Sequence, residues 1–208
     1  MKLSRAWVWA SLLLVLQSGG CDIAHSVNPF YFQENIIVDP SIVGEWQDSD
    51  SSRVSSLTIR PLSTDSCAFA FMVLDKDTKR KTTMEFEAHL FRFQNENYVD
   101  ILPRKFQVAG KNEEYVSSDD DLEFYAPVHS ALRLVREKDD LSLLFSVDAS
   151  PVFAKEDEQT KKAREEEDQR KRIAILTMST EQLQREVLPS FPADKASATL
   201  STTFHRGK

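Results

Sequence analysis

Short runs of alternating apolar and polar residues recur along residues 41–148 and constrain the fold more than any other feature. In residues 84–90, the apolar side chains of Met84, Phe86, Ala88 and Leu90 occupy every second position. A period of two places alternate side chains on one face of a β-strand. Seven strands are expected, at residues 42–46, 54–62, 67–74, 84–90, 98–103, 128–136 and 141–148. Residues 67–74 are continuously apolar, which fits a strand covered on both faces. Polar turns separate the strands, and no helical pattern intervenes, so the sequence predicts an antiparallel sandwich or barrel.

The pattern changes at about residue 150. Ser150 and Pro151 suit a helix start, and 14 of the 18 residues in 155–172 are charged. Acidic residues stand four positions before basic ones in this stretch, which favours an exposed helix. A second helix is expected to begin at Ser179 or Thr180 and to end before Pro189. The helical segment therefore covers about 150–188, and residues 200–205 are a possible last strand that pairs with the first and closes a barrel.

Residues 1–20 have the plan of a secretory signal peptide. Lys2 and Arg5 precede an 11-residue run, residues 6–16, in which every residue except Ser11 is apolar. Such a run is too short for a membrane-spanning helix of about 20 residues. Residues 1–20 are therefore expected to be removed from the mature chain.

The residues after this run, Ser18-Gly19-Gly20-Cys21, resemble the lipobox of bacterial lipoproteins. The resemblance implies that the Cys21 thiol receives a diacylglyceryl group and that the new amine receives an acyl chain such as palmitate. It also implies a cell-envelope location, facing the periplasm or the exterior. Asp22 resembles the inner-membrane retention signal of enterobacterial lipoproteins. The alternative is a plain signal peptide cut near Gly20, with Cys21 an ordinary cysteine.

The mature chain divides into a lipidated tether, residues 21–40, and a single domain, residues 41–208. The formal charge of the full chain is −7. The removal of Lys2 and Arg5 takes it to −9, so acyl chains rather than attraction to anionic lipid would hold the protein at the membrane. Phe30, Tyr31 and Phe32 lie in the tether, and we expect them to dock on the domain.

Gly44-Glu45-Trp46, at the first expected strand, resembles the G-x-W opening of lipocalin-like barrels. Residues 86–92, 98–103, 127–134 and 175–183 resemble segments of a group of small uncharacterised bacterial lipoproteins. The resemblance implies a mainly β fold: an antiparallel lipocalin-like barrel of about seven or eight strands, followed by C-terminal helices. It implies no activity. We expect Trp46 to be a structural plug at one barrel end.

Composition and motifs exclude several functions. The five glycines form no phosphate-binding loop, and an acidic chain disfavours nucleic acid as a partner. The four histidines are not in metal-ligand spacing, so no metal ion or cofactor is expected. No G-x-S-x-G motif of serine hydrolases occurs. Cys67 lies in an apolar run, which predicts a buried, inert thiol.

Two functions stay open. The first is a non-catalytic, membrane-anchored envelope lipoprotein that binds an apolar ligand or a protein partner through its barrel, with ligand-binding residues that the pattern does not identify. The alternative is a hydrolase or isomerase in which His89 and His129 converge in a barrel cavity. Alternation places both histidines opposite Leu90 and Leu132, which also fits histidines at the surface or rim of the barrel.

Overall fold

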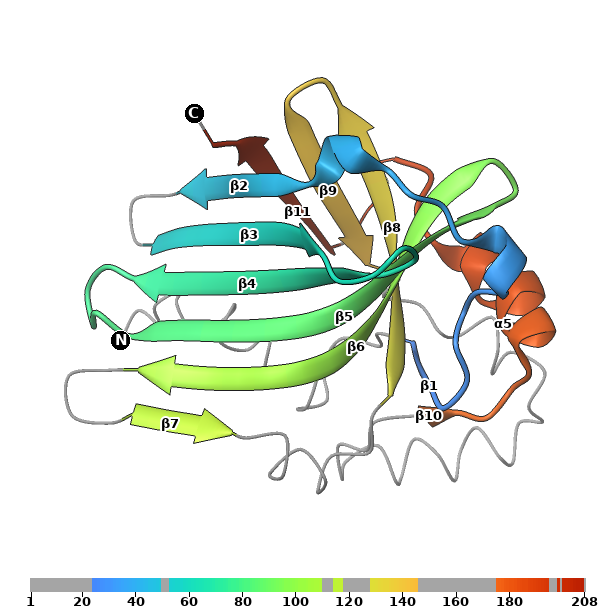
Figure 1. The fold of residues 1–208 in the computed structure, drawn as a ribbon, viewed down its shortest axis with the longest axis horizontal. Coiled ribbons are helices and arrows are strands. Elements are labelled where there is room, and N and C mark those ends of the chain that lie inside the picture. Colours follow the sequence, from blue (N-terminus) through green and yellow to red (C-terminus); the bar gives the residue numbers. More distant parts are fainter. Residues whose placement is uncertain are drawn as a thin grey trace.

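Eight antiparallel strands close into a barrel in the computed structural model (Figure 1). The structure describes residues 24–49, 53–109, 114–117, 128–145, 175–194, 198 and 200–207. The barrel strands are β2 (Gly44–Ser49), β3 (Arg53–Pro61), β4 (Cys67–Asp75), β5 (Lys81–Phe93), β6 (Glu96–Ala109), β8 (His129–Glu137), β9 (Asp140–Phe145) and β11 (Leu200–Arg206). The prediction of a mainly β, antiparallel barrel is confirmed.

The order of the strands explains how the barrel closes. Strands β2 to β6 pair consecutively, β8 pairs with β9, and β11 lies between β9 and β2. The circle closes where β6 pairs with β8, from Tyr98 opposite Arg133 to Ile101 opposite Ser130. The last strand does pair with the first barrel strand, because Arg206 is opposite Trp46. The predicted closing strand is therefore confirmed.

Three short strands of the described residues lie outside the circle. Strand β7 (Glu114–Ser117) pairs with the far half of β6, in a region that the sequence suggested was a polar loop. Strand β1 (His25–Ser26) pairs with β8, and β10 (Ile175–Leu176) pairs with β1 in parallel. The sequence analysis placed Ile175 and Leu176 at the end of a helix instead. They form a strand because β1 offers them an edge to pair with.

Apolar side chains fill the barrel. The large residues Trp46, Leu57, Ile59, Phe69, Leu141 and Leu143 all have an exposed fraction of 0%. Phe71 is partly buried and joins this core: its ring meets Phe86 edge-on with centroids 5.7 Å apart, and Phe204 with centroids 6.3 Å apart. Strands β4 and β11 are not neighbours in the sheet. The Phe71–Phe204 contact therefore crosses the barrel interior, which is packed with side chains.

Trp46 occupies the position expected of a plug. Its ring is fully buried, and the indole Nε1–H donates to the carbonyl oxygen of Ile42 at 2.7 Å. The guanidinium of Arg206 lies 5.2 Å from the ring centroid. Gly44 begins this strand with φ +135°, a backbone conformation that L side chains rarely adopt. The G-x-W segment thus combines a bend that requires glycine with an indole that seals the core.

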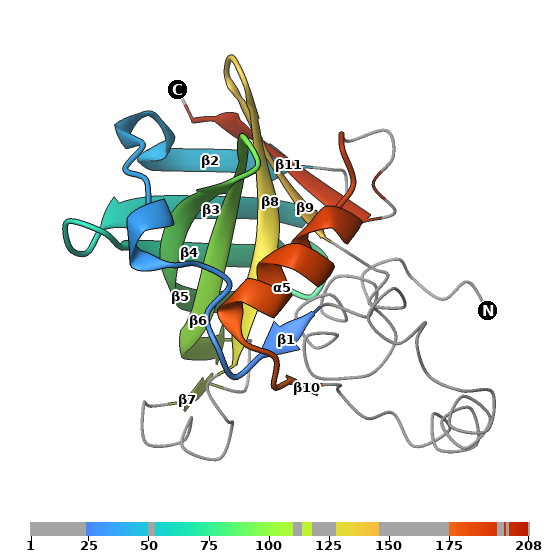
Figure 2. The same ribbon diagram turned by 90° about the vertical axis from the view of Figure 1, so that its right-hand side faces the viewer.

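A second apolar cluster lies outside the barrel wall, under helix α5 (Thr180–Glu186). Figure 2 shows α5 crossing the wall at β6 and β8. Leu183, Val187, Leu188 and Phe191 pack there against Phe91, Tyr98 and Ala131 of the strands, together with Phe30. Ser179, one of the two starting positions that the sequence offered, caps the helix in a capping box with Gln182. The charged segment 155–172 lies outside the described residues.

Residues 24–43, which we call the N-terminal strap, lie against this wall. The strap contains β1 and two 3₁₀ helices, η1 (Gln33–Asn35) and η2 (Pro40–Ile42), and a third, η3 (Leu188–Ser190), follows α5. Phe30 is fully buried, so the prediction that the aromatic residues dock on the domain is confirmed for it. The described part of the expected tether is packed because burying this ring outweighs the freedom of a linker. Among the described residues, no helix is long and apolar enough to cross a membrane.

Candidate functional site on the outer wall

The two histidines of the sequence analysis lie on the outer face of the barrel wall. His89 is on β5 and His129 is on β8, and β6 pairs with both strands. Leu90 and Leu132 belong to the core, and His89 and His129 stand one and three positions before them, so alternation along each strand turns both imidazoles outward. The alternative in which both histidines converge inside a cavity is therefore wrong, whereas their placement opposite Leu90 and Leu132 is confirmed.

A buried carboxylate lies on the strand between the two histidines. Asp100 of β6 has an exposed fraction of 0%. Its Oδ1 is 2.7 Å from Nδ1 of His129, and its Oδ2 accepts a hydrogen bond of 2.8 Å from the backbone N–H of Phe30. In the β5–β6 ladder, Asp100 is directly opposite His89. One side chain thus joins the barrel wall, β8 and the strap.

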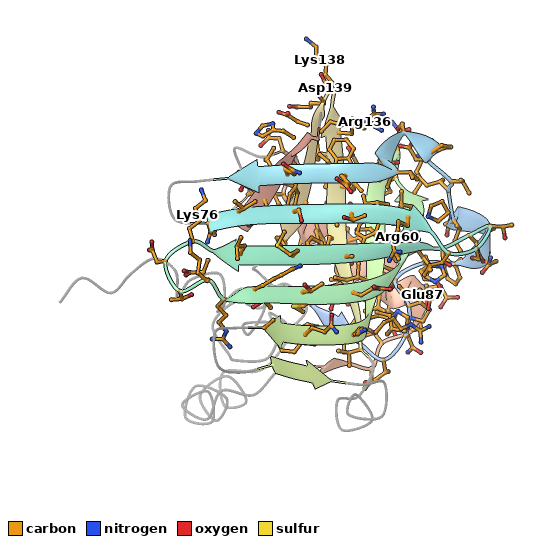
Figure 3. The ribbon with its side chains drawn as sticks, turned by 60° about the vertical axis from the view of Figure 1, so that its left-hand side comes forward. Arg60, Lys76, Glu87, Arg136, Lys138 and Asp139 are labelled. Carbon is orange, nitrogen blue, oxygen red and sulfur yellow. The ribbon has the colours of Figure 1, made fainter. Side chains whose placement is uncertain are left out.

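His89 has its own partners on β5, on the strap and on the connection between β3 and β4. Its Nδ1 is 3.1 Å from the carbonyl oxygen of Asp65, and its Nε2 is 3.2 Å from a carboxylate oxygen of Glu87. The Tyr31 ring stacks on the imidazole with centroids 4.7 Å apart. Glu87 also pairs with Arg104, and Figure 3 shows Glu87 on the outside of the wall. These contacts define what we call the Asp100 cluster: Tyr31, Glu87, His89, Asp100, Arg104 and His129.

Burial and pairing shift the proton affinities of the cluster in different directions. Burial raises the pKa of Asp100, and the hydrogen bonds from His129 and Phe30 oppose that rise. The bond from Arg104 lowers the pKa of Glu87. Burial raises the pKa of Tyr31 to about 12, and the negative charges of Asp100, Glu87 and Asp65 add to the rise. Tyr31 therefore remains a neutral phenol at physiological pH.

Further contacts hold the strap beside the cluster. Nδ1 of His25 is 2.8 Å from the hydroxyl oxygen of Ser130, and burial lowers the pKa of His25 to about 4, so the ring is neutral. The side-chain amide of Gln184 in α5 donates to the carbonyl oxygen of Phe30 at 2.9 Å. Both backbone polar groups of Phe30 are thus satisfied by buried side chains, which fixes the strap between the wall and α5.

The chemistry open to the cluster is limited. The contact between His129 and Asp100 is the one that orients an imidazole as a general base. Within the described residues, however, neither His89 nor His129 hydrogen-bonds a hydroxyl or a thiol that could serve as a nucleophile. Those residues also contain no group of three metal-binding side chains. The arrangement favours a structural node that fastens the strap to the barrel.

An open cleft of about 560 Å³ lies near the turn between β5 and β6. Arg133 lines it; its Nη1 donates to the carbonyl oxygen of Pro192 at 2.7 Å, and its Nη2 is 2.6 Å from Glu96. The Nε of Arg133 is buried without a partner. Glu96, Glu137 and Asp194 line the same cleft, so its carboxylates outnumber Arg133 and Arg136.

The sequence analysis identified only part of this arrangement. Cys21 and Asp22 lie outside the described residues. Cys67 is half-buried, and burial raises the pKa of its thiol, which agrees with an inert residue. Asp100 was missed, although a lone carboxylate inside the apolar run 98–103 was a signal for it. Tyr31, Glu87 and Arg104 gave no such signal, because their roles depend on which segments meet in space.

Comparison with family models, with curated proteins and with solved structures found no match to this chain.

Proposed function

We propose that the protein is a lipid-anchored, non-catalytic component of the bacterial cell envelope that binds a protein partner through the outside of its barrel. The proposed anchor is the acylated Cys21, supported by the apolar run of residues 6–16 and the small residues before Cys21. Asp22 supports retention at the inner membrane. The barrel resembles a lipocalin in its G-x-W opening and in the helix that comes before its last strand.

The filled interior carries the preference for a protein partner over an apolar ligand. A ligand pocket of a binding protein is a concavity of roughly 300–1,000 Å³ that encloses most of its ligand. Here many inner positions of the described strands hold fully buried side chains such as Trp46, Phe69 and Leu143, and partly buried rings such as Phe71 and Phe145 pack against them. The cleft beside Arg133 has a suitable volume, but it is open and lies outside the barrel core.

Substitution of the anchor cysteine tests the attachment. Wild-type protein should be found in the membrane fraction with the added mass of its acyl chains. Cys21→Ser should lose both the added mass and the membrane association. The matched control is Cys67→Ser, which changes the other cysteine and should keep both. If Cys21→Ser still carried acyl chains, or partitioned as wild type does, the anchor would be wrong.

Native mass spectrometry tests how the barrel is used. The lipidated protein, purified in mild detergent, should carry no stoichiometric small molecule besides its own acyl chains. The reason is that Phe71 and Phe204 already meet across the interior. A stoichiometric apolar compound that dissociates only on unfolding would contradict this expectation and would favour an internal ligand.

The contact between His129 and Asp100 supports a second candidate, a hydrolase or isomerase. In that case His129 acts as a base that Asp100 orients, with His89 on the other side of β6. Turnover of an ester or of an isomerisable substrate that is lost in His129→Gln, with folding unchanged, would favour this candidate. Equal background rates in both proteins would leave the binding role as the better proposal.

A further inference from the structure

We infer that the barrel lies directly on the membrane in a fixed orientation, with the end that carries β1 and β10 toward the lipid. This inference rests on the proposed acylation of Cys21. It concerns which surface of the domain meets the bilayer, a question that the anchor alone leaves open. Three observations carry it: the firm attachment of residues 24–26, the few residues before them, and the lack of Asp, Glu, Lys and Arg in the described segments 24–33 and 175–180.

The chain is fixed to the barrel as soon as the described residues begin. Ala24, His25 and Ser26 have exposed fractions of 4%, 5% and 0%. His25 pairs with Ser130 of β8 in the ladder, and its ring contacts the Ser130 hydroxyl. The Ser26 hydroxyl and the Val27 N–H both donate to the carbonyl oxygen of Leu176 in β10, at 3.2 and 3.1 Å. Any pull on the N-terminus is therefore transmitted to the β1 end of the barrel.

Few residues separate this fixed point from the proposed anchor. Only Asp22 and Ile23 lie between Cys21 and Ala24. Three steps of fully extended chain span at most about 11 Å. Acyl chains enter the hydrocarbon region, so Cys21 has to lie at the membrane surface. Ala24 cannot then be more than about 11 Å from it, and the domain has no linker long enough to turn freely.

The surface near β1 also suits a bilayer by its charge. Residues 24–33 and 175–180 contain no Asp, Glu, Lys or Arg, in a mature chain of formal charge −9. Burial lowers the pKa of His25 to about 4, so this ring adds no charge at neutral pH. Val27, next to β1, is 50% exposed. Approach of this end to anionic lipid therefore costs less than approach of the acidic surfaces elsewhere.

The other end of β8, away from β1, is highly charged. The turn from β8 to β9 consists of Glu137, Lys138, Asp139 and Asp140, all charged. Ser130 pairs with β1 and Glu137 begins this turn, seven residues further along the strand, which corresponds to roughly 23 Å. Figures 1 and 2 both show the turn and β1 at opposite ends of the molecule, and Figure 3 labels Lys138 at the tip. The turn should point away from the membrane.

Depth-dependent fluorescence quenching tests the orientation. A fluorophore is attached in turn to Val27→Cys and Lys138→Cys in the full, lipidated chain, with Cys67 replaced by alanine. The protein is reconstituted in vesicles of phosphatidylethanolamine and phosphatidylglycerol that contain a lipid with a nitroxide on its headgroup. We expect quenching to be several-fold stronger at position 27 than at position 138. Equal quenching at both positions, or stronger quenching at position 138, would overturn the orientation.

A longer linker between the anchor and the domain provides the control. About twelve Gly and Ser residues inserted between Ile23 and Ala24 span roughly 20 Å on average, enough for the domain to turn. The insertion should reduce the difference between the two positions while membrane attachment persists. An unchanged difference in quenching between the two positions would mean that the short connection to Cys21 does not set the orientation. That result would overturn the inference.

The mass of the mature chain separates this inference from the proposed function. A chain without acyl mass overturns both the anchor and the orientation that depends on it. A lipidated chain with equal quenching at the two positions overturns the orientation alone.

Discussion

Asp100 shows how much of this fold depends on single polar side chains. Its carboxylate is fully buried, yet it receives a hydrogen bond from the Phe30 backbone and contacts His129. A buried acid without such partners would cost several kcal/mol. Its partners come from the strap and from β8. The hydrogen bonds of the carboxylate therefore stabilise one particular placement of both segments. The same dependence makes the site sensitive to pH.

Because burial raises the pKa of Asp100 above its ordinary value of 3.8, the folded state holds this proton more firmly than the unfolded state does. The contribution of Asp100 to stability is therefore largest at acid pH, and it falls as pH rises through the raised pKa. Asp100→Asn removes this titration. We expect the stability advantage of wild type over Asp100→Asn to shrink between pH 4 and pH 7, measured by urea unfolding. An advantage that grows with pH over this interval would contradict the direction of the shift.

Trp46 allows a prediction about packing. Trp46→Ala should lower the free energy of unfolding by about 3–5 kcal/mol, because the variant leaves a large cavity in a filled core. The matched variant Trp46→Phe keeps an aromatic ring and loses the bond to the Ile42 carbonyl, so it should cost less. Trp46 is the only tryptophan after residue 20, so both variants lack tryptophan fluorescence as a signal of unfolding. Circular dichroism is therefore the suitable measurement. A Trp46→Ala protein with the unfolding midpoint of wild type would exclude the plug.

At the scale of elements, alternation predicted the barrel strands well and their surroundings poorly. Residues 84–90 alternate because one face meets the core, and the structure places that face inward. Strand β5 continues beyond this run, to Phe93, because Phe91 packs under the strap and α5 instead. The sequence of the strap resembled a linker, because it contains Pro29, Pro40 and several polar residues, and the structure places only a two-residue strand, β1, in it. Local pattern cannot reveal a segment whose stability comes from contacts more than 100 residues away.

The strap offers a direct test of this element-scale packing. Phe30→Ala should destabilise the protein by about 3–5 kcal/mol and should speed hydrogen exchange at residues 24–31, because the buried ring fixes the strap under α5. Phe32→Ala is the matched control: this ring is only partly buried and belongs to neither core cluster. It should have a clearly smaller effect. Similar losses in both variants would mean that Phe30 is not the residue that fastens the strap.

At the scale of the whole molecule, closure joins the last described strand to the first strand of the barrel. Strand β11 supplies a hydrogen-bonding partner to β2, about 160 residues earlier, and to β9 along six residues. The β6–β8 pairing completes the circle. A barrel has no free edges, whereas an open sheet exposes edges that pair with other chains. Such distant pairing also favours slow folding, since long loops must close before the contacts form.

Removal of the last strand should therefore cost far more than its length suggests. A chain that ends at residue 199 leaves the edges of β2 and β9 without a partner and removes Phe204, which is 2% exposed in the core. We expect this chain to lose cooperative unfolding and to associate, as judged by circular dichroism and light scattering. A chain that ends at Gly207 keeps every β11 pair and the bond from the Gly207 N–H to the Glu45 carbonyl, so it should behave as wild type. If the shorter chain stayed monomeric and unfolded cooperatively, closure by β11 would not be what holds the barrel together.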